Sequence, residues 1–294
     1  MTPALRATVA DVTRHRCGPS YVVVQAETSH VQARASHLEA VDLFCGFGGV
    51  SEGLKRAGLN VALAVDLDAR AVRSHRAWHP EIPVFRRDVS QVRPSDLAGR
   101  FVWASPSCRP YSMANTTGPR GMDHPEYFPL EHLFHLALGA RVLVIENVPG
   151  LMWSKAGQAE LKNLERACAA LRVSLQVIEA DAKEFGVPQS RRRVFLVIGA
   201  PLVMLSRDFR PGAVSHPTVT THSSGDVSYL AAVQGLTNPL ELNVPDWRSG
   251  RRSSRSQVPV AGVHTARRLV GNAIPPEMAQ AVACGVLEAL GVDS

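Results

Sequence analysis

The chain has 294 residues, of which 45% are hydrophobic and 20% charged, a composition typical of a globular protein with one large domain or one large and one small domain. Its formal net charge of +6 favours a polyanionic partner such as nucleic acid. No apolar run reaches the length of a membrane span, and no secretory signal opens the chain, so we expect a cytoplasmic protein without a membrane partner. The five cysteines contain no CxxC pair, which argues against disulfides and a metal site and favours a reducing compartment.

Strand and helix patterns alternate from about residue 40 to about residue 200. An earlier run, 21–25, is either an appendage or an edge strand. We expect seven strands, at 40–44, 59–65, 82–86, 101–104, 141–145, 173–180 and 194–198. We expect helices at 51–57, 69–78 (with Asp68 as N-cap), 129–138 and 156–171. This order predicts an α/β fold with a doubly wound, mostly parallel seven-stranded sheet and a small irregular second region.

The strand at 101–104 delivers Cys108 onto a loop at its carboxyl end, where open α/β sheets keep their chemistry. Cys108 lies between Pro106 and Pro110 and next to Arg109. A nearby cation favours the thiolate, so Cys108 is a candidate nucleophile. The other interpretation is a small buried hydrophobic residue, which free cysteines usually are.

A glycine-rich turn, Gly46-Phe-Gly-Gly49, follows the first regular strand. Ser51 replaces the third glycine of the dinucleotide fingerprint, which argues against a pyrophosphate cofactor. Asp66 and Asp88 follow the next two strands, where carboxylates can accept hydrogen bonds from ribose hydroxyls. Each aspartate alone is more simply explained as a cap or turn residue. Together they indicate a cofactor that carries a nucleoside.

Five ordered motifs across residues 42–276 resemble those of the cytosine-C5 methyltransferases, which use S-adenosylmethionine. The motifs are Asp42-Leu-Phe-Cys-Gly-Phe-Gly-Gly49, Ser105-Pro-Ser-Cys-Arg-Pro-Tyr-Ser112, Glu146-Asn-Val148, Gln189-Ser-Arg-Arg-Arg193 and Gly271-Asn-Ala-Ile-Pro-Pro276. This resemblance implies a DNA (cytosine-5-)-methyltransferase with the Rossmann-like fold of that family.

The resemblance also implies catalytic roles. Cys108 would add to cytosine C6, which makes C5 able to accept a methyl group. Glu146 would protonate N3 or donate a hydrogen bond to it, which requires a protonated carboxyl group. Asn147 would orient the nucleophile loop. Arg193, and less directly Arg191, would brace the pyrimidine O2 and that loop.

Two further sets of residues follow from the same resemblance. The S-adenosylmethionine site would be lined by Asp42, Phe44, Gly46, Gly48, Gly49, Asp66, Leu67, Asp88 and Asn272. Contacts with double-stranded DNA would come from Arg109, Ser112, Arg248, Arg251, Arg252 and Arg255. A target base inside a duplex has to be flipped out, and residues 113–125 are the expected lid. We expect a monomer without a metal ion.

The nucleophile loop departs from the family pattern at two positions. The family usually has Pro-Pro-Cys-Gln, whereas this chain has Pro106-Ser107-Cys108-Arg109. The nucleophile is kept. The rigidity of the loop and one polar contact are changed.

The composition shifts near residue 201. We expect an N-terminal extension at 1–38, a catalytic and cofactor-binding domain at 39–200, a small basic target-recognition region at 201–266 and a returning segment at 267–294. Only residues 201–215 separate the last strand from a segment resembling the one that follows the family's recognition region. Recognition should therefore be short or relaxed. Residues 248–255 are either a solvated basic loop or a clamp on the nucleic-acid backbone.

Three functions stay open at this point. The leading hypothesis is a DNA-associated cytoplasmic enzyme of a prokaryote or phage that methylates cytosine C5, as in restriction–modification. An RNA cytosine methyltransferase is the second, because a short recognition region suits a substrate recognised by its shape. A cofactor-binding regulatory homologue without activity is the third, suggested by Ser107 and Arg109.

Overall fold

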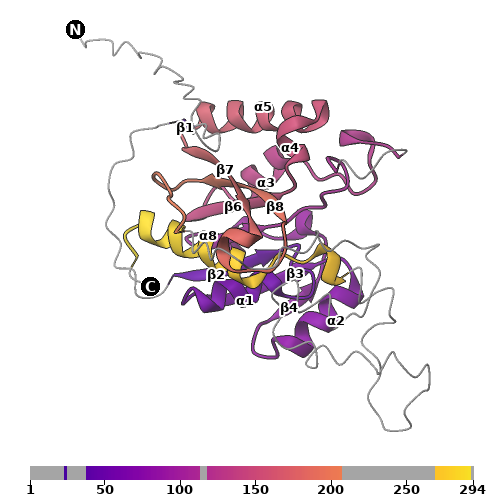
Figure 1. Ribbon diagram of the computed structural model, residues 1–294, viewed down its shortest axis with the longest axis vertical. Helices are drawn as coiled ribbons and strands as arrows, with labels where there is room; N and C mark the ends of the chain where they lie inside the picture. Colours follow the sequence, from indigo (N-terminus) through magenta and orange to yellow (C-terminus); the bar gives the residue numbers. More distant parts are fainter. Residues whose placement is uncertain (1–22, 25–37, 113–117, 207–268, 293–294) are drawn as a thin grey trace.

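The computed structural model describes residues 23–24, 38–112, 118–206 and 269–292. Its centre is an eight-stranded sheet with the strand order β1-β7-β8-β6-β5-β2-β3-β4 (Figure 1). The strands are β1 (Val23–Val24), β2 (Glu39–Leu43), β3 (Asn60–Asp66), β4 (Val84–Arg86), β5 (Phe101–Ala104), β6 (Val142–Asn147), β7 (Leu175–Asp181) and β8 (Arg192–Ile198). Strands β6, β5, β2, β3 and β4 form a parallel block, whereas β8 runs antiparallel to β6 and β7.

The mostly parallel α/β sheet expected from the sequence is confirmed, with all seven predicted strands present. The strand count is eight, because the early run left open between appendage and edge strand pairs antiparallel with β7 as the two-residue strand β1. The strand predicted from residue 82 begins at Val84, directly after Pro83, which has no N–H group to donate to a ladder.

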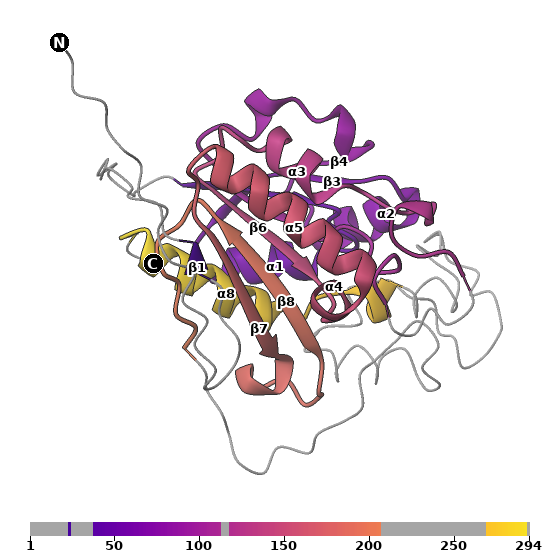
Figure 2. The ribbon, with the colours of Figure 1, turned by 90° about the horizontal axis from the view of Figure 1, so that it is seen from above.

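Helices cover both faces of the sheet (Figure 2). One face packs against α1 (Gly49–Arg56), α2 (Ala69–Trp78) and α8 (Pro276–Ala289), and the other against α3 (Leu130–Leu136), α4 (Gly150–Trp153) and α5 (Lys155–Ala170). Single 3-10 turns lie at Val89–Gln91, Pro94–Asp96, Gly121–Asp123 and Ala182–Phe185. The N-cap predicted at Asp68 is present, because its carboxylate accepts from the Arg70 amide at 2.8 Å.

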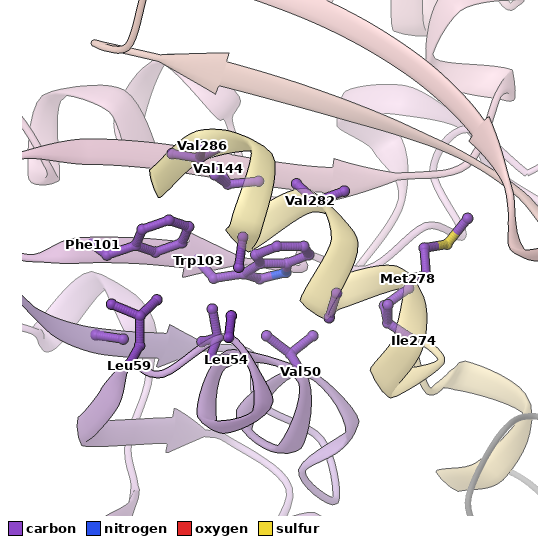
Figure 3. Packing of buried hydrophobic residues seen from close by; sticks show 14 of the residues in the cluster. Val50, Leu54, Leu59, Phe101, Trp103, Val144, Ile274, Met278, Val282 and Val286 are labelled. Carbon is purple, nitrogen blue, oxygen red and sulfur yellow. The ribbon is translucent and has the colours of Figure 1, made fainter. Parts of the chain in front are cut away.

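Helix α8 brings the C-terminal segment back onto the sheet. Val282 and Val286 are fully buried and lie close to Trp103 and Val144, and Met278 is buried further along the helix near Ile274 (Figure 3). The neighbouring contact between α8 and α1 depends on Gly53, since a Cβ atom there would lie 2.5 Å from the Ala279 methyl group. The last sequence motif is thereby held against the helix that follows the glycine turn.

The sheet order reverses at β2, whose parallel neighbours are β3 and β5. Connections that leave β2 and β5 run to opposite sides, and ligands of doubly wound sheets bind in the crevice at such a point. The glycine turn after β2 and the loop after β5 both begin here. Backbone bonds join the two strand ends, with the Ser105 amide donating to the Leu43 carbonyl at 3.1 Å. The fold thus places both predicted motifs at one edge of the sheet.

Candidate active site

The nucleophile loop starts where β5 ends and turns sharply at Cys108. The Tyr111 amide donates to the Cys108 carbonyl at 3.1 Å and closes the turn. Asn147, at the end of the adjacent strand β6, donates from Nδ2 to the Pro106 carbonyl at 3.2 Å. The role predicted for Asn147, orienting this loop, therefore has a matching contact.

Glu146 and Arg193 form a buried ion pair beside this loop. They come from the antiparallel strands β6 and β8, and Arg193 Nε lies 2.9 Å from Glu146 Oε1. Only 6% of the Glu146 surface is exposed. Burial raises the pKa of the Glu146 carboxyl group, while Arg193 and Arg191 act in the opposite direction. The direction of the net shift suits a carboxyl group that holds a proton for donation.

The environment of Cys108 differs from the expectation that Arg109 acidifies it. Arg109 Nη1 instead lies 2.7 Å from a carboxylate oxygen of Glu126. Burial raises the pKa of the Cys108 thiol, Arg193 lowers it, and Glu146 raises it further. The cation that most lowers the pKa of Cys108 is thus Arg193, two strands away in the sheet order, and not the predicted Arg109. The net shift favours the thiol over the thiolate.

Arg191 contacts the last sequence motif. Its guanidinium is buried and donates from Nη2 to the carbonyls of Gly271 and Ala273, at 2.9 and 2.8 Å. Arg191 therefore ties β8 to the last sequence motif, and the contact with a pyrimidine expected for it stays a prediction. Sequence spacing could not separate the two arginines, because their different surroundings come from the return of the chain at residues 271–273.

The glycine turn is built around the carboxylate of Asp66. The Gly46 amide donates to Asp66 Oδ2 at 2.9 Å and the Asp68 amide to Oδ1 at 2.8 Å. Gly48 has a φ of 113°, and a Cβ atom at Gly49 would lie 2.4 Å from the Ile274 carbonyl oxygen. Asp66 thus shapes the turn as well as standing at the carboxyl edge of the sheet.

The other predicted cofactor residues surround this edge. Leu67 is 61% exposed, and Phe44, with a φ of 59°, makes an edge contact with Phe128. Asp88 accepts from the Ser90 amide at 2.9 Å and caps a 3-10 turn, and Asn272 is exposed. An exposed apolar side chain beside carboxylates and a glycine-rich turn suits a nucleoside.

Asp42, which was also predicted to line the cofactor site, is fully buried beneath the turn. The Ser51 hydroxyl donates to its Oδ2 at 2.7 Å, and Ser51 Oγ lies 2.9 Å from His75 Nε2. Burial raises the pKa of Asp42 to about 7 and lowers that of His75 to about 3.

Sequence reasoning missed His75 and His79, whose spacing on one helix face was the available signal. His79 Nε2 lies 3.1 Å from the Gly48 carbonyl oxygen, so both rings support the turn.

The residues predicted to contact nucleic acid are only partly described. Arg109 is exposed and Ser112 half-buried beside the nucleophile loop. Residues 113–117 of the predicted lid, Arg248, Arg251, Arg252 and Arg255 lie outside the described residues, as does most of the predicted recognition region. Glu126, which sequence reasoning did not single out, binds Arg109 from the far end of the lid segment.

In the described part of the chain, no helix has both the length and the apolar character that a membrane span needs. The histidine, cysteine and acidic side chains of the same part form no group of three or more that could hold a metal ion.

Solved structures with a similar fold include methyltransferases of low sequence identity. The S. pombe Dnmt2 methyltransferase aligns with a TM-score of 0.59 at 16% identity, over 86% of this chain and 99% of that one. The Entamoeba histolytica methyltransferase EhMeth aligns with a TM-score of 0.63 at 12% identity, over 86% and 98%. These likenesses support the methyltransferase-like α/β fold.

Curated relatives are more similar in sequence. The Type II methyltransferase M.AgeI of Thalassovita gelatinovora is 31% identical over 174 residues, 54% of this chain and 39% of that protein. The Type II methyltransferase M.MthTI of Methanothermobacter thermautotrophicus is 29% identical over 234 residues, 74% of this chain and 67% of that protein. The match to M.AgeI thus spans about two fifths of the relative's length.

Residues 38–201, more than half of the chain, match the C-5 cytosine-specific DNA methylase family. This span contains the glycine turn, the nucleophile loop, Glu146 and Arg193, which the sheet brings to one edge. Together with the fold, this match establishes that the chain belongs to the C-5 cytosine-specific DNA methylase family.

Proposed function

We propose that the protein transfers a methyl group from S-adenosylmethionine to C5 of cytosine in double-stranded DNA. The observation that carries this proposal is the convergence of Cys108 with the buried pair of Glu146 and Arg193 at the carboxyl edge of the sheet. The family supports DNA as substrate, because residues 38–201 match the C-5 cytosine-specific DNA methylases. The similar proteins M.AgeI and M.MthTI are Type II methyltransferases by name.

The Cys108 thiol first loses its proton to solvent, and the thiolate that forms starts the reaction. Its Sγ forms a bond with C6 of the flipped cytosine, and the electron pair of the C5–C6 double bond moves toward N3. Glu146 donates its proton to N3, so no negative charge accumulates on the ring. Arg193 stabilises the carboxylate that Glu146 becomes, through the ion pair at 2.9 Å. The two side chains thus act as one unit of proton donor and counter-ion.

S-adenosylmethionine supplies an electrophilic methyl group when bound. The turn at 46–49, the carboxylates of Asp66 and Asp88 and the exposed Leu67 side chain are the groups that would hold its nucleoside. Asp42 would support this site indirectly. It accepts a hydrogen bond from Ser51 in α1, and it is fully buried, so it would not touch the ligand itself. After C5 is methylated, its proton leaves to a base and the bond between Sγ and C6 breaks. We assign no side chain to that base.

A duplex substrate implies base flipping at a cost of a few kcal/mol for unstacking and unpairing. Loops surround the carboxyl edge of the sheet, so a base stacked inside a DNA duplex would not reach Cys108. The exposed Arg109 and the half-buried Ser112 beside the nucleophile loop support the prediction that they contact the flipped strand. Phosphate contacts of this kind position the duplex but carry no sequence information.

Methyl transfer from labelled S-adenosylmethionine tests the proposal. We expect label on duplex DNA, with base-resolution mapping placing it on cytosine C5, and none with Cys108→Ser. A matched assay with structured RNA separates the RNA hypothesis, and label on RNA alone would overturn the choice of DNA. Binding of S-adenosylmethionine without transfer to either substrate would instead support the regulatory homologue.

A further inference from the structure

The two residues that flank Cys108 share one carboxylate. The Ser107 hydroxyl donates to Glu126 Oε2 at 2.6 Å, and Arg109 Nη1 donates to Glu126 Oε1 at 2.7 Å. The Arg109 amide also donates to Ser107 Oγ at 3.4 Å. Ser107 and Arg109 are the two positions at which the loop departs from the family's usual Pro-Pro-Cys-Gln. Both departures therefore meet at Glu126.

Glu126 stands on a segment that is fixed to the body of the protein. The next residue, Tyr127, donates its hydroxyl to Glu160 of α5, and the Leu130 amide donates to the other oxygen of Glu160 at 3.0 Å. Glu160 is only 5% exposed. The Glu126 amide itself donates to His124 Nδ1 at 3.0 Å. A side chain on this segment can hold a neighbouring loop in place, because its own backbone is anchored on both sides.

Other contacts hold the two ends of the nucleophile loop. The Pro106 carbonyl accepts from Asn147, and the Gly121 amide donates to the Pro110 carbonyl at 3.0 Å. Close packing at Tyr111 adds to this, since a Cβ atom at Gly150 would lie 2.0 Å from its carbonyl oxygen. The middle of the loop, 107–109, is tied to the described part of the protein outside the loop by Glu126. That contact also joins residues just before the predicted lid to the residue just after it.

We infer that Glu126 is a positioning residue for Cys108. Its contacts with Ser107 and Arg109 replace the rigidity that a proline before the cysteine gives other members of the family. A proline fixes its own φ, whereas Ser107 does not, so the loop needs an external restraint. The inference rests on the proposed function, because it assigns Glu126 a part in holding the nucleophile. Misplacement by about 1 Å can slow a reaction on the order of 100-fold, so we expect a loss of about 10- to 100-fold on removing the restraint.

The test is a comparison of Glu126→Gln in two backgrounds. In the natural chain we expect kcat for methyl transfer to fall by about 10- to 100-fold with an unchanged KM for S-adenosylmethionine. In the background Ser107→Pro with Arg109→Gln, which has the usual family loop, Glu126→Gln should change kcat by less than about twofold, because the carboxylate has lost both partners. Equal losses in the two backgrounds, or no loss in the natural one, would overturn the inference.

Glu131→Gln is the matched control. Glu131 is an exposed acid in the first turn of α3, and its replacement changes the net charge by the same amount without touching the nucleophile loop. We expect kcat to stay within about twofold of the natural chain. If both variants change kcat and DNA affinity alike, Glu126 acts through charge alone and the inference fails.

A readout independent of methyl transfer separates this inference from the proposed function. We expect Glu126→Gln to increase deuterium uptake in a peptide covering 106–112 and to leave β6 unchanged, because the loop opens while the sheet stays folded. If the natural chain transfers no methyl group but Glu126→Gln still increases deuterium uptake in 106–112, the proposed function alone is contradicted. Unchanged uptake in 106–112 would contradict the restraint whatever the activity.

Discussion

Glu146 is buried and Cys108 is half-buried, and desolvation shifts both pKa values toward the protonated form. The resting site therefore favours a neutral thiol beside a carboxyl group that can keep a proton. The raised pKa of Glu146 suits its proposed role as a proton donor. The raised pKa of Cys108 disfavours the thiolate and so opposes nucleophilic attack. Arg193 connects the two residues, since it forms the ion pair with Glu146 and lowers the pKa of Cys108.

At the residue scale, we predict that Glu146→Gln slows methyl transfer by about 10²- to 10⁴-fold, because the amide cannot give a proton to N3. Binding of S-adenosylmethionine should change little, since the glycine turn lies on a different strand. Single-turnover rates and cofactor titrations measure the two quantities separately. Matching losses in rate and in cofactor affinity would mean that Glu146 supports the fold.

At the element scale, the link between β2, α1 and α2 makes stability depend on pH. Asp42 has its pKa raised from 3.8 to about 7, so its contribution is present below pH 3.8 and is lost as pH rises through about 7. His75 has its pKa lowered from 6.5 to about 3, so its contribution is present above pH 6.5 and is lost as pH falls. Between pH 3.8 and 6.5 a rise in pH lowers the stability contributed by Asp42 and raises that contributed by His75, so the two effects on unfolding free energy oppose each other.

We therefore predict that Asp42→Asn gains stability relative to the natural chain as pH rises. Between pH 4.5 and 6.5 the difference in unfolding free energy should grow by about 1.4 kcal/mol per pH unit, because the variant no longer loses stability through Asp42. Urea unfolding at several pH values measures it. Curves that stay parallel for the two proteins would show that Asp42 is ionised in the folded state at low pH.

The elements themselves were largely predictable from sequence, because continuous apolar runs such as Val142–Ile145 read as strands covered on both faces. The short helix α4 was not predicted, because its four residues are too few to show a helical period. Within the site, Cys108, Glu146 and Asn147 followed from motif order. The buried position of Asp42, the turn of Arg191 toward residues 271–273 and the contacts of Glu126 depend on long-range packing, which local patterns do not encode.

At the scale of the whole molecule, the net charge of +6 is concentrated partly in residues 201–270, which hold eight arginines against four acidic residues. We predict that replacing Arg248, Arg251, Arg252 and Arg255 together by Gln weakens DNA binding about equally on all sequences and flattens its salt dependence, because phosphate contacts release counterions. Binding isotherms at several salt concentrations on two unrelated duplexes measure both effects. A changed preference between the duplexes would mean that these arginines read bases.

The covalent bond between Cys108 and the target base is the central claim, and trapping it is the most direct test. Fluorine at C5 cannot leave as a proton does, so a duplex with 5-fluorocytosine at the mapped target should stop the reaction before the bond to C6 breaks. With S-adenosylmethionine present, mass spectrometry should find a methylated nucleotide attached to the peptide that contains Cys108, and Cys108→Ser should yield none. Methyl transfer to normal DNA without any adduct on Cys108, or an adduct on another cysteine, would contradict the account.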